Sequence, residues 1–155
     1  MSIKLRDLFN DLGYPYEMLE IDVPIDVSEK KYEIRSWNPE KNQFEWSRLS
    51  KIVKKEKSQA HKVICRDSEL LTSSNHMVWS TIEDGDEGWS FVSDLIGVNC
   101  KILTNDGAFE KAEVIKLEEY IDILDIEVEG NNSYISNGLV SHNTMYGDNM
   151  VTPGG

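Results

Sequence analysis

The chain has 155 residues, 39% hydrophobic and 28% charged, which suits one domain with a sizeable core and excludes a disordered segment. Its 28 acidic residues outnumber its 16 basic residues, and the net charge of −12 argues against binding to nucleic acid or to anionic membrane surfaces. No apolar run approaches the roughly 20 residues of a membrane span, and residues 1–6 lack the apolar region of a signal peptide. We therefore expect a cytoplasmic protein.

The cysteines and histidines do not indicate a metal site. Cys65 and Cys100 lie far apart in segments typical of strands, and neither has a partner at the spacing of zinc ligands. We expect both thiols to be buried and reduced, and we expect no metal and no cofactor. The acidic loop at residues 84–88 lacks the oxygen-ligand spacing of a calcium loop and indicates a turn.

A helix is predicted only near the start of the chain. Leu5, Leu8, Phe9 and Leu12 recur at helical spacing, and Gly13 is a typical residue for ending a helix. The prediction is one short helix within residues 3–12.

Beyond this helix, short segments that alternate polar and apolar residues predict β-strands. Residues 32–46 are typical of a hairpin around the turn at 38–42. Residues 89–95 and 98–103 are predicted to be short strands or helical turns. The other predicted strands are residues 20–23, 60–65, 77–79, 112–117, 121–128, 134–135 and 139–140. Many short strands at this spacing predict an all-β fold class.

Residues 47–57 carry five basic residues in an otherwise acidic chain. One interpretation is a docking patch for an acidic partner segment. The other is a solvated strand or loop face, which general charge patterning favours.

The stretch from Asn137 to Thr144 combines a turn, a short apolar strand and three adjacent reactive side chains. Asn137-Gly138 favours a turn, and the following Leu-Val pair is typical of a buried strand. The side-chain nitrogen of Asn143 is able to attack its own backbone carbonyl, forming a succinimide and breaking the bond to Thr144. His142 is able to supply the proton for the departing nitrogen, and Thr144 offers a hydroxyl nucleophile.

Three stretches resemble the splicing motifs of inteins, the Hint-fold elements that excise themselves from a precursor. Residues 137–143 are similar to the C-terminal motif, which ends in His-Asn before a Cys, Ser or Thr. Residues 124–128, with Asn132 and Tyr134 after them, resemble the motif just upstream, although Asn132 stands where the family often has His. Residues 73–76 resemble the internal Thr-x-x-His motif, with Ser73 in the place of Thr and Thr72 one residue off the spacing.

The opening motif of inteins has its counterpart at the other end of the chain. Residues 144–151 are similar to it, with Thr144 in the nucleophile place and Gly147-Asp148 at the matching offset. We interpret residues 1–143 as the C-terminal portion of an atypically split mini-intein. Residues 144–155 would then be its short N-terminal splicing motif, appended as in a circular permutant. The alternative is that residues 144–155 are a flanking segment, or extein, which begins at Thr144.

The resemblance implies a horseshoe-like all-β Hint fold with one or two short helices and a role for each matching residue. Thr144 would accept an acyl group from nitrogen onto oxygen, His76 would donate a proton to the departing nitrogen, and Ser73 with the backbone near Asn75 would support the oxyanion. Asp125 would help to activate the attacking hydroxyl, and Asn143 would cyclise with help from His142.

The implied activity is single-turnover protein splicing, by N-to-O acyl shift, transesterification and Asn cyclisation. It requires neither cysteine. The implied partners are a complementary split fragment and the flanking exteins, with the chain itself a monomer. Two other classes stay open. A small all-β binding module predicts no self-cleavage, and a hydrolase that pairs His76 with a distant serine predicts turnover of added substrates. An autoprocessing Hint domain without splicing is disfavoured by the Asn143 ending.

Overall fold

The computed structural model describes residues 3–82, 85–142, 145–146 and 150–151, and β-strands dominate it. The helical elements among these residues are α1 (Leu5–Asp11) and three short 3₁₀ helices, η1 (Tyr16–Met18), η2 (Ser28–Lys30) and η3 (Val92–Leu95). The strands are β1 (Ile3–Lys4), β2 (Ile25–Asp26), β3 (Glu33–Asn38), β4 (Gln43–Ile64), β5 (Glu69–Thr72), β6 (Met77–Ile82), β7 (Glu87–Phe91), β8 (Cys100–Leu103), β9 (Phe109–Val128), β10 (Tyr134–Ser136), β11 (Leu139–His142), β12 (Met145–Tyr146) and β13 (Met150–Val151). No helix in this described part is long and apolar enough to cross a membrane.

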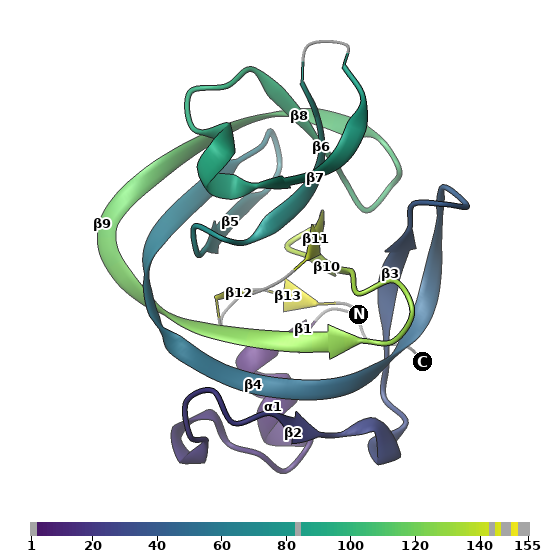
Figure 1. Cartoon of the computed structure of the whole chain (residues 1–155), viewed down its shortest axis with the longest axis vertical. Coiled ribbons are helices and arrows are strands. Elements are labelled where there is room, and N and C mark those ends of the chain that lie inside the picture. Colours follow the sequence, from purple (N-terminus) through teal and green to yellow (C-terminus); the bar gives the residue numbers. More distant parts are fainter. Residues whose placement is uncertain (1–2, 83–84, 143–144, 147–149, 152–155) are drawn as a thin grey trace.

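Two long antiparallel strands, β4 and β9, form the frame of the molecule and curve together around it (Figure 1). Their register shifts between Lys55 and Ser58 and again between Gln59 and His61. Such irregularities bend a strand and let 22 and 20 residues wrap around the interior. The sequence predicted two shorter strands in place of each, because a bulge interrupts the alternation of polar and apolar residues.

The remaining strands attach to this frame in one antiparallel sheet. The strand order is β10-β11-β6-β8-β9-β4-β2, while β12 pairs with β9, β3 and β5 pair with β4, and β7 pairs with β6. A separate two-stranded sheet joins β1 to β13, so segments from the two ends of the chain lie side by side. The predicted all-β fold class is confirmed, as is the hairpin at residues 32–46, in which Trp37 faces Phe44.

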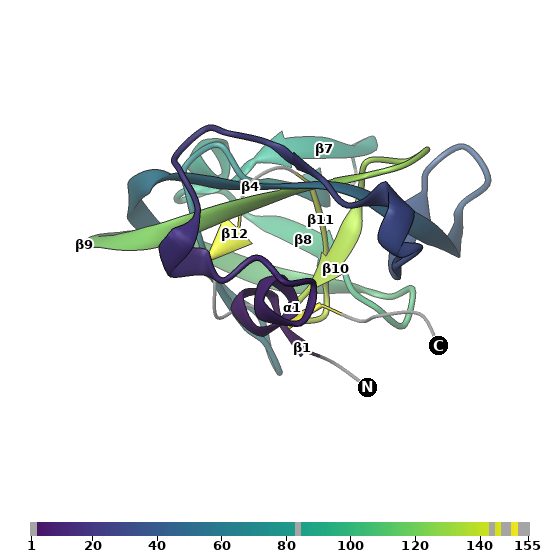
Figure 2. The same cartoon turned by 90° about the horizontal axis from the view of Figure 1, so that it is seen from below.

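Helix α1 closes one end of the molecule (Figure 2). Leu5, Leu8 and Phe9 are fully buried in a cluster with β4 and β9 residues such as Ile52 and Leu124. Burying such a helical stripe is the main source of stability for a helix of this length. The predicted helix and its end at Gly13, whose φ is +92°, are confirmed.

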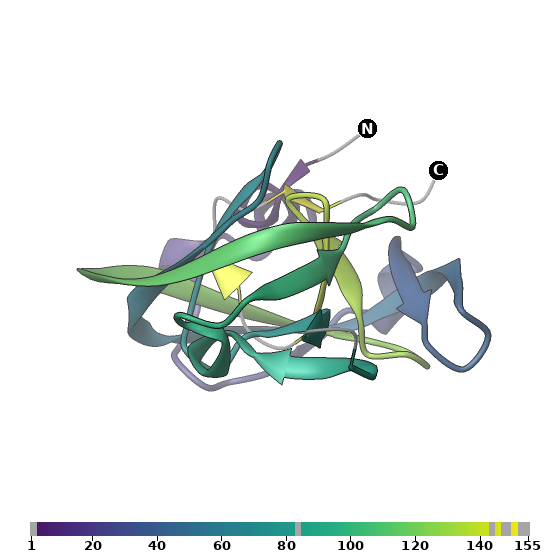
Figure 3. The same ribbon diagram turned by 90° about the horizontal axis from the view of Figure 1, so that it is seen from above.

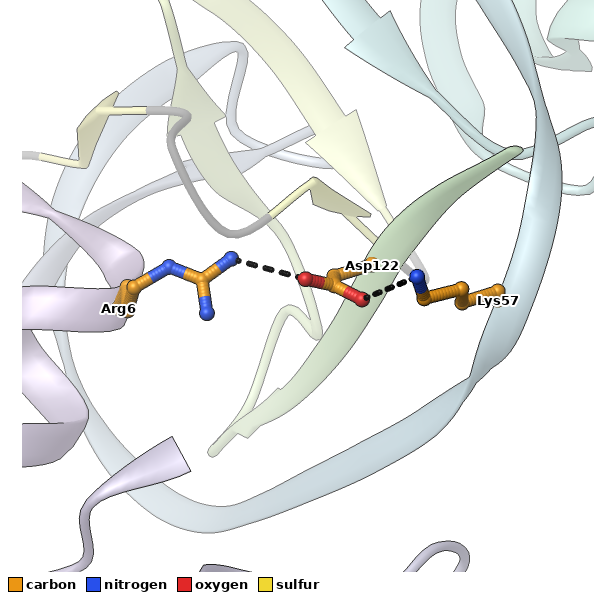
Figure 4. A network of polar contacts seen from close by, with 3 residues as sticks. All are labelled: Arg6, Lys57 and Asp122. Atoms are coloured by element: carbon orange, nitrogen blue, oxygen red, sulfur yellow. Dashed lines mark hydrogen bonds and ion pairs between the residues drawn. The ribbon is translucent and has the colours of Figure 1, made fainter. Parts of the chain in front are cut away.

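An ion network ties α1 to both long strands (Figure 4). The Asp122 carboxylate of β9 lies 3.4 Å from Nη2 of Arg6 in α1 and 3.9 Å from Nζ of Lys57 in β4. The guanidinium of Arg6 also lies 4.5 Å from the ring centre of Tyr16. Burial, and next the charge of Asp122, raise the pKa of Tyr16 to about 12. The network therefore fixes the helix on the frame near the point where β12 pairs with β9.

The opposite end of the molecule is a lobe made by β5 to β8 and η3 (Figure 3). Its own core cluster contains Val78, Leu95 and Ile102 together with both cysteines. Cys65 and Cys100 are buried free thiols, as predicted. Burial raises the pKa of both, that of Cys65 to about 11, so both remain protonated at neutral pH.

The strand predicted at residues 20–23 is wrong. Asp22 has a φ of +63°, which interrupts the extended backbone, and its amide donates a hydrogen bond to the carbonyl of Lys54 at 2.8 Å. Only an isolated bridge between Ile21 and Lys54 forms there, and the paired strand is β2, a few residues later.

Candidate functional site

A tight turn between β5 and β6 holds the first group of candidate residues. The amide of His76 donates to the carbonyl of Ser73 at 3.3 Å, which closes the turn. The hydroxyl of Ser73 donates to Oδ1 of Asn75 at 2.6 Å. Ser73 and His76 are buried, whereas Asn75 is exposed. The predicted Ser-x-x-His motif therefore forms a turn in which the side chains of Ser73 and His76 are both buried.

Helix η3 supports this turn from the side. The amide of Val92 donates to the carbonyl of His76 at 2.8 Å, and the amide of Ser93 donates to the carbonyl of Ser74 at 3.2 Å. The turn's backbone is therefore held by hydrogen bonds from a second element. A cavity of about 230 Å³ opens beside the turn, lined by Lys55, Glu56, Ser58, Ser73, Ser74, Asn75 and Ile123.

The imidazole of His76 lies in an enclosed environment beside Tyr134. The two ring centres are 6.4 Å apart, and both side chains are almost completely buried. Tyr134 opens β10 and pairs with Ser141 of β11, which in turn pairs with Val78 of β6. Burial, and next the charge of Asp125, raise the pKa of Tyr134 well above its usual value, so its hydroxyl is neutral.

His142 ends β11, directly across from Met77 of β6. It is therefore one residue along the ladder from His76. Its imidazole packs edge-on against Trp89 of β7 with ring centres 5.4 Å apart, and Trp79 packs on Trp89 in the same manner at 5.2 Å. The β6–β7 hairpin thus orients the histidine that precedes Asn143.

Asp125 lies on β9, partly buried, and pairs with Val53 of β4. Burial raises the pKa of this carboxyl, while the charge of Lys55, the amide of Ile126 and the charge of His142 act in the opposite direction. The charge of Asp125 also raises the pKa of Tyr134, and the charge of His142 lowers the pKa of Asp125. Asp125, Tyr134 and His142 therefore lie close enough to interact electrostatically.

The sheet thus brings together four of the predicted site residues: Ser73, His76, Asp125 and His142. Ser73 and His76 come from a turn, Asp125 from β9 and His142 from β11, and these segments are up to 69 residues apart in sequence. The order of β11, β6, β8 and β9 in one sheet brings them together. A buried hydroxyl, two imidazoles and a carboxyl are suited to donating and accepting protons around a backbone carbonyl.

Two further supporting residues lie among the described residues. Thr72 is buried at the end of β5, paired with His61 of β4. Asn132 is exposed in the turn between β9 and β10, with a φ of +52°. Its neighbour Asn131 donates to Ser36 and Glu45 of the β3–β4 hairpin. Among the described residues no hydrogen bond joins Asn132 to either histidine.

Four predicted site residues, Asn143, Thr144, Gly147 and Asp148, lie outside the described residues. The segments that flank them are described. Met145 and Tyr146 form β12, which pairs with Leu124 and Ile123, so Met145 lies beside the strand neighbour of Asp125.

The sequence patterns predict no place in the site for Tyr134, Trp89 or Lys55. In the structure Tyr134 lies beside His76, Trp89 contacts His142, and the charge of Lys55 lowers the pKa of Asp125. Tyr134 was noted only as part of a motif. Trp89 and Lys55 approach the site through strand register, and a signal for them would have required knowing which strands pair. Within residues 3–82, 85–142, 145–146 and 150–151, no group of three His, Cys, Asp or Glu side chains is arranged to hold a metal ion.

No family model and no curated protein matches the sequence. Solved structures do match the fold. The chain is similar to the TvoVMA intein, with a TM-score of 0.71 and 19% identity over 91% of this chain and 88% of that one. It is also similar to the DnaX mini intein from Spirulina platensis, with a TM-score of 0.60 and 24% identity over 72% of this chain and 81% of that one. The VidaL intein matches with a TM-score of 0.56 and 24% identity, over 72% and 70% of the two chains. The fold is therefore the intein, or Hint, fold.

Proposed function

We propose that this chain, whose fold is that of inteins, is a protein-splicing element that cleaves its own backbone after Asn143. The observation that carries the proposal is the convergence of strands around the junction. Register puts His142 across from Met77, next to His76, and puts Met145 beside Leu124, next to Asp125. His142 and Met145, the residues on either side of Asn143-Thr144, are thus each one strand position from His76 and Asp125, respectively.

The C-terminal step uses the Asn143 side chain as the nucleophile. Its amide nitrogen attacks the Asn143 carbonyl carbon, the bond to the nitrogen of Thr144 breaks, and a succinimide forms. The departing nitrogen takes up a proton, which His142 supplies or polarises. Packing of His142 on Trp89 supports this role, because it fixes the ring at the end of β11.

The N-terminal step uses the hydroxyl of Thr144. When a polypeptide precedes Thr144, the hydroxyl attacks the preceding carbonyl, the C–N bond breaks, and an ester replaces the amide. We assign proton donation to the freed nitrogen to His76 and support of the oxyanion to Ser73 and the backbone near Asn75. Asp125 is the acceptor that activates the hydroxyl of the residue after Asn143, since a threonine hydroxyl ionises far less readily than a thiol.

We further propose that residues 144–155 are the N-terminal splicing motif of a split intein, appended behind residues 1–143. Two pairings support this order over a flanking extein. β12 extends the main sheet on β9, and β13 pairs with β1. Val151 is buried in the same cluster as Leu5 and Phe9. A flanking extein is not expected to contribute a strand and a core residue to the folded domain, whereas part of the intein is.

In this chain order Thr144 fills both the first position and the position after Asn143. Full splicing is then not available, because no flanking polypeptides occupy both positions, and cleavage before Thr144 remains. Each chain reacts once, and because Cys65 and Cys100 are buried free thiols in the core of the lobe and neither is a proposed site residue, the reaction is independent of thiols.

The test is intact-mass spectrometry of the purified chain over time at neutral pH, alongside Asn143→Ala. We expect loss of residues 144–155, a succinimide on the larger piece, and no loss in the variant. Persistent cleavage in Asn143→Ala would overturn the role of Asn143. If the mass of the wild type does not change, the result favours a small binding module. The two-piece experiment then decides between that module and a splicing element whose joined ends prevent cleavage.

The two-piece experiment restores the natural order and tests the split. One polypeptide carries an extein followed by residues 144–155, and the other carries residues 1–143 followed by an extein that begins with Thr. The proposal expects a ligated product of the two exteins and a one-to-one complex of the two intein pieces. Absence of ligation, with residues 144–155 shown to bind, would sink the assignment of splicing.

A further inference from the structure

A charged groove runs along one face of β4 and β9 beside the site. Lys51, Val53 and Lys55 of β4 pair with Glu127, Asp125 and Ile123 of β9. Because side chains alternate between the faces of a strand, these six residues share one face. A cavity of about 250 Å³ opens over five of them, with Asp22 at its wall: Lys51, Val53, Lys55, Asp125 and Glu127.

Lys55 occupies a special position on this face. It lines the cavity that contains Asp125 and also the cavity beside the turn of Ser73 and Asn75. Its Nζ forms an ion pair with Oδ1 of Asp22 at 3.0 Å. One cation therefore lines both cavities of the site, paired with the carboxylate of Asp22 and on the same cavity wall as the carboxylate of Asp125.

The loop that carries Asp22 is attached to the same strand. Its amide is bonded to the carbonyl of Lys54, and its left-handed backbone directs the chain back over β4. The carboxylate of Asp22 is largely exposed, so its pull on Lys55 is partly screened by solvent.

We propose that Lys55 is a positioning residue that keeps Asp125 ionised for splicing, and that Asp22 opposes it by competing for the ammonium group. The proposal rests on the proposed function. In support, Lys55 is the strongest of the groups that lower the pKa of Asp125 against its burial. Within the part of the chain that the structure describes, the other charged or titratable groups around Asp125 are Lys51, Glu127, Asp22, His142 and Tyr134.

The opposing roles make a signed test possible. Removing the charge in Lys55→Met should move the titration of Asp125 to higher pH, whereas Asp22→Asn should move it to lower pH. Lys55→Arg keeps the charge and should stay close to the wild type. Lys54→Met is the matched control, because Lys54 is the next residue on the same strand but packs on the other face, 4.4 Å from the ring centre of Tyr16.

The primary readout is the carboxyl carbon-13 resonance of Asp125, followed by NMR titration in the full chain with Asn143→Ala to prevent cleavage. A larger upward shift in Lys55→Met than in Lys54→Met, with a downward shift in Asp22→Asn, supports the proposal. Equal shifts in the two lysine variants, or an upward shift in Asp22→Asn, would overturn it. If Lys55→Met fails to fold, the other two titrations still test the proposal: Asp22→Asn should lower the pH at which Asp125 titrates, and Lys55→Arg should leave it close to the wild type.

The second readout is the pH profile of ligation in the two-piece reaction. The acidic limb of the profile should move in the same direction as the Asp125 titration in each variant, with the rate at alkaline pH kept in Lys55→Met. Because the NMR titration needs no reaction, the ionic role of Lys55 is judged even when ligation itself fails. Movement of the NMR titration without movement of the rate profile would separate Lys55 from the reaction and overturn the proposal.

Discussion

The two halves of the site differ in how they are built. His76 and Ser73 lie in a closed turn, buried beside Tyr134 and held by backbone hydrogen bonds from η3. Asp125 lies on a partly open face, among lysines and carboxylates that line a cavity. The enclosed half fixes hydrogen-bond geometry, whereas the open half is governed by charge. The first should respond to changes in shape and the second to pH and salt.

The largest effect is expected from the enclosed half. His76→Ala should slow ester formation at Thr144 by about 10² to 10⁴, the usual contribution of a positioned acid–base group. The measurement is the rate at which hydroxylamine releases the upstream extein from the assembled two-piece complex. We expect the fold to survive, as judged by circular dichroism.

His61→Ala is the control for this variant. His61 is also a buried histidine, with Nδ1 3.3 Å from the carbonyl of Gln59, but it lies on β4 and faces Thr72. Its loss should lower stability and leave the ester-forming rate within a few-fold of the wild type. An equal loss of rate in both variants would mean that His76 acts only through folding.

The open half should show its role through pH. Asp125→Asn should slow ligation by about 10², since it removes the proposed proton acceptor. The same substitution should increase stability at neutral pH. Burial raises the pKa of Asp125, so the folded state binds this proton more tightly than the unfolded state, and stability falls as pH rises from the unfolded value of 3.8 through the folded pKa.

Asp125→Asn removes this pH-dependent cost. The difference between the free energies of unfolding of the variant and the wild type should therefore move in favour of the variant from pH 4 to pH 7. Urea denaturation at the two pH values measures the difference. Glu127→Gln, an exposed neighbour on the same face, is the control: its charge is the weakest of the influences on the pKa of Asp125, so both quantities should change less than in Asp125→Asn. A variant that loses stability relative to the wild type at pH 7 would show that the carboxylate is a net stabilising group there.

The two halves also differ in how far the sequence predicted them. The spacing of Ser73 and His76 and the ending at His142 are local patterns, and they were found without knowing any long-range pairing. Lys55 and Tyr134 reach the site through long-range register, β4 with β9 for Lys55 and β11 with β6 for Tyr134, whose strand β10 pairs with β11. Register across 70 residues is not written in local periodicity, particularly where bulges interrupt it, so charge at the site was harder to predict than its reactive groups.

The same reasoning explains the fold. The hairpin at residues 32–46 was predicted because its turn and its alternation lie in one short stretch, where Asn38 accepts hydrogen bonds from the amides of Glu40 and Lys41. The strand expected at 20–23 failed because a single residue, Asp22, adopts a positive φ that is set by its contact with β4. Tertiary contact overrode local propensity there.

The smallest effect tests how the enclosed half works. Tyr134→Phe keeps the ring beside His76 and removes only the hydroxyl, whose high pKa keeps it neutral during the reaction. If the tyrosine acts by packing, the rate of ester formation should fall less than tenfold and stability by about 1 kcal/mol. Tyr134→Leu, which loses the ring, should lower the rate further, because His76 would no longer be held. A loss in Tyr134→Phe as large as that in His76→Ala would instead make the hydroxyl part of the chemistry. The enclosed half would then contain a proton path that its shape alone does not explain.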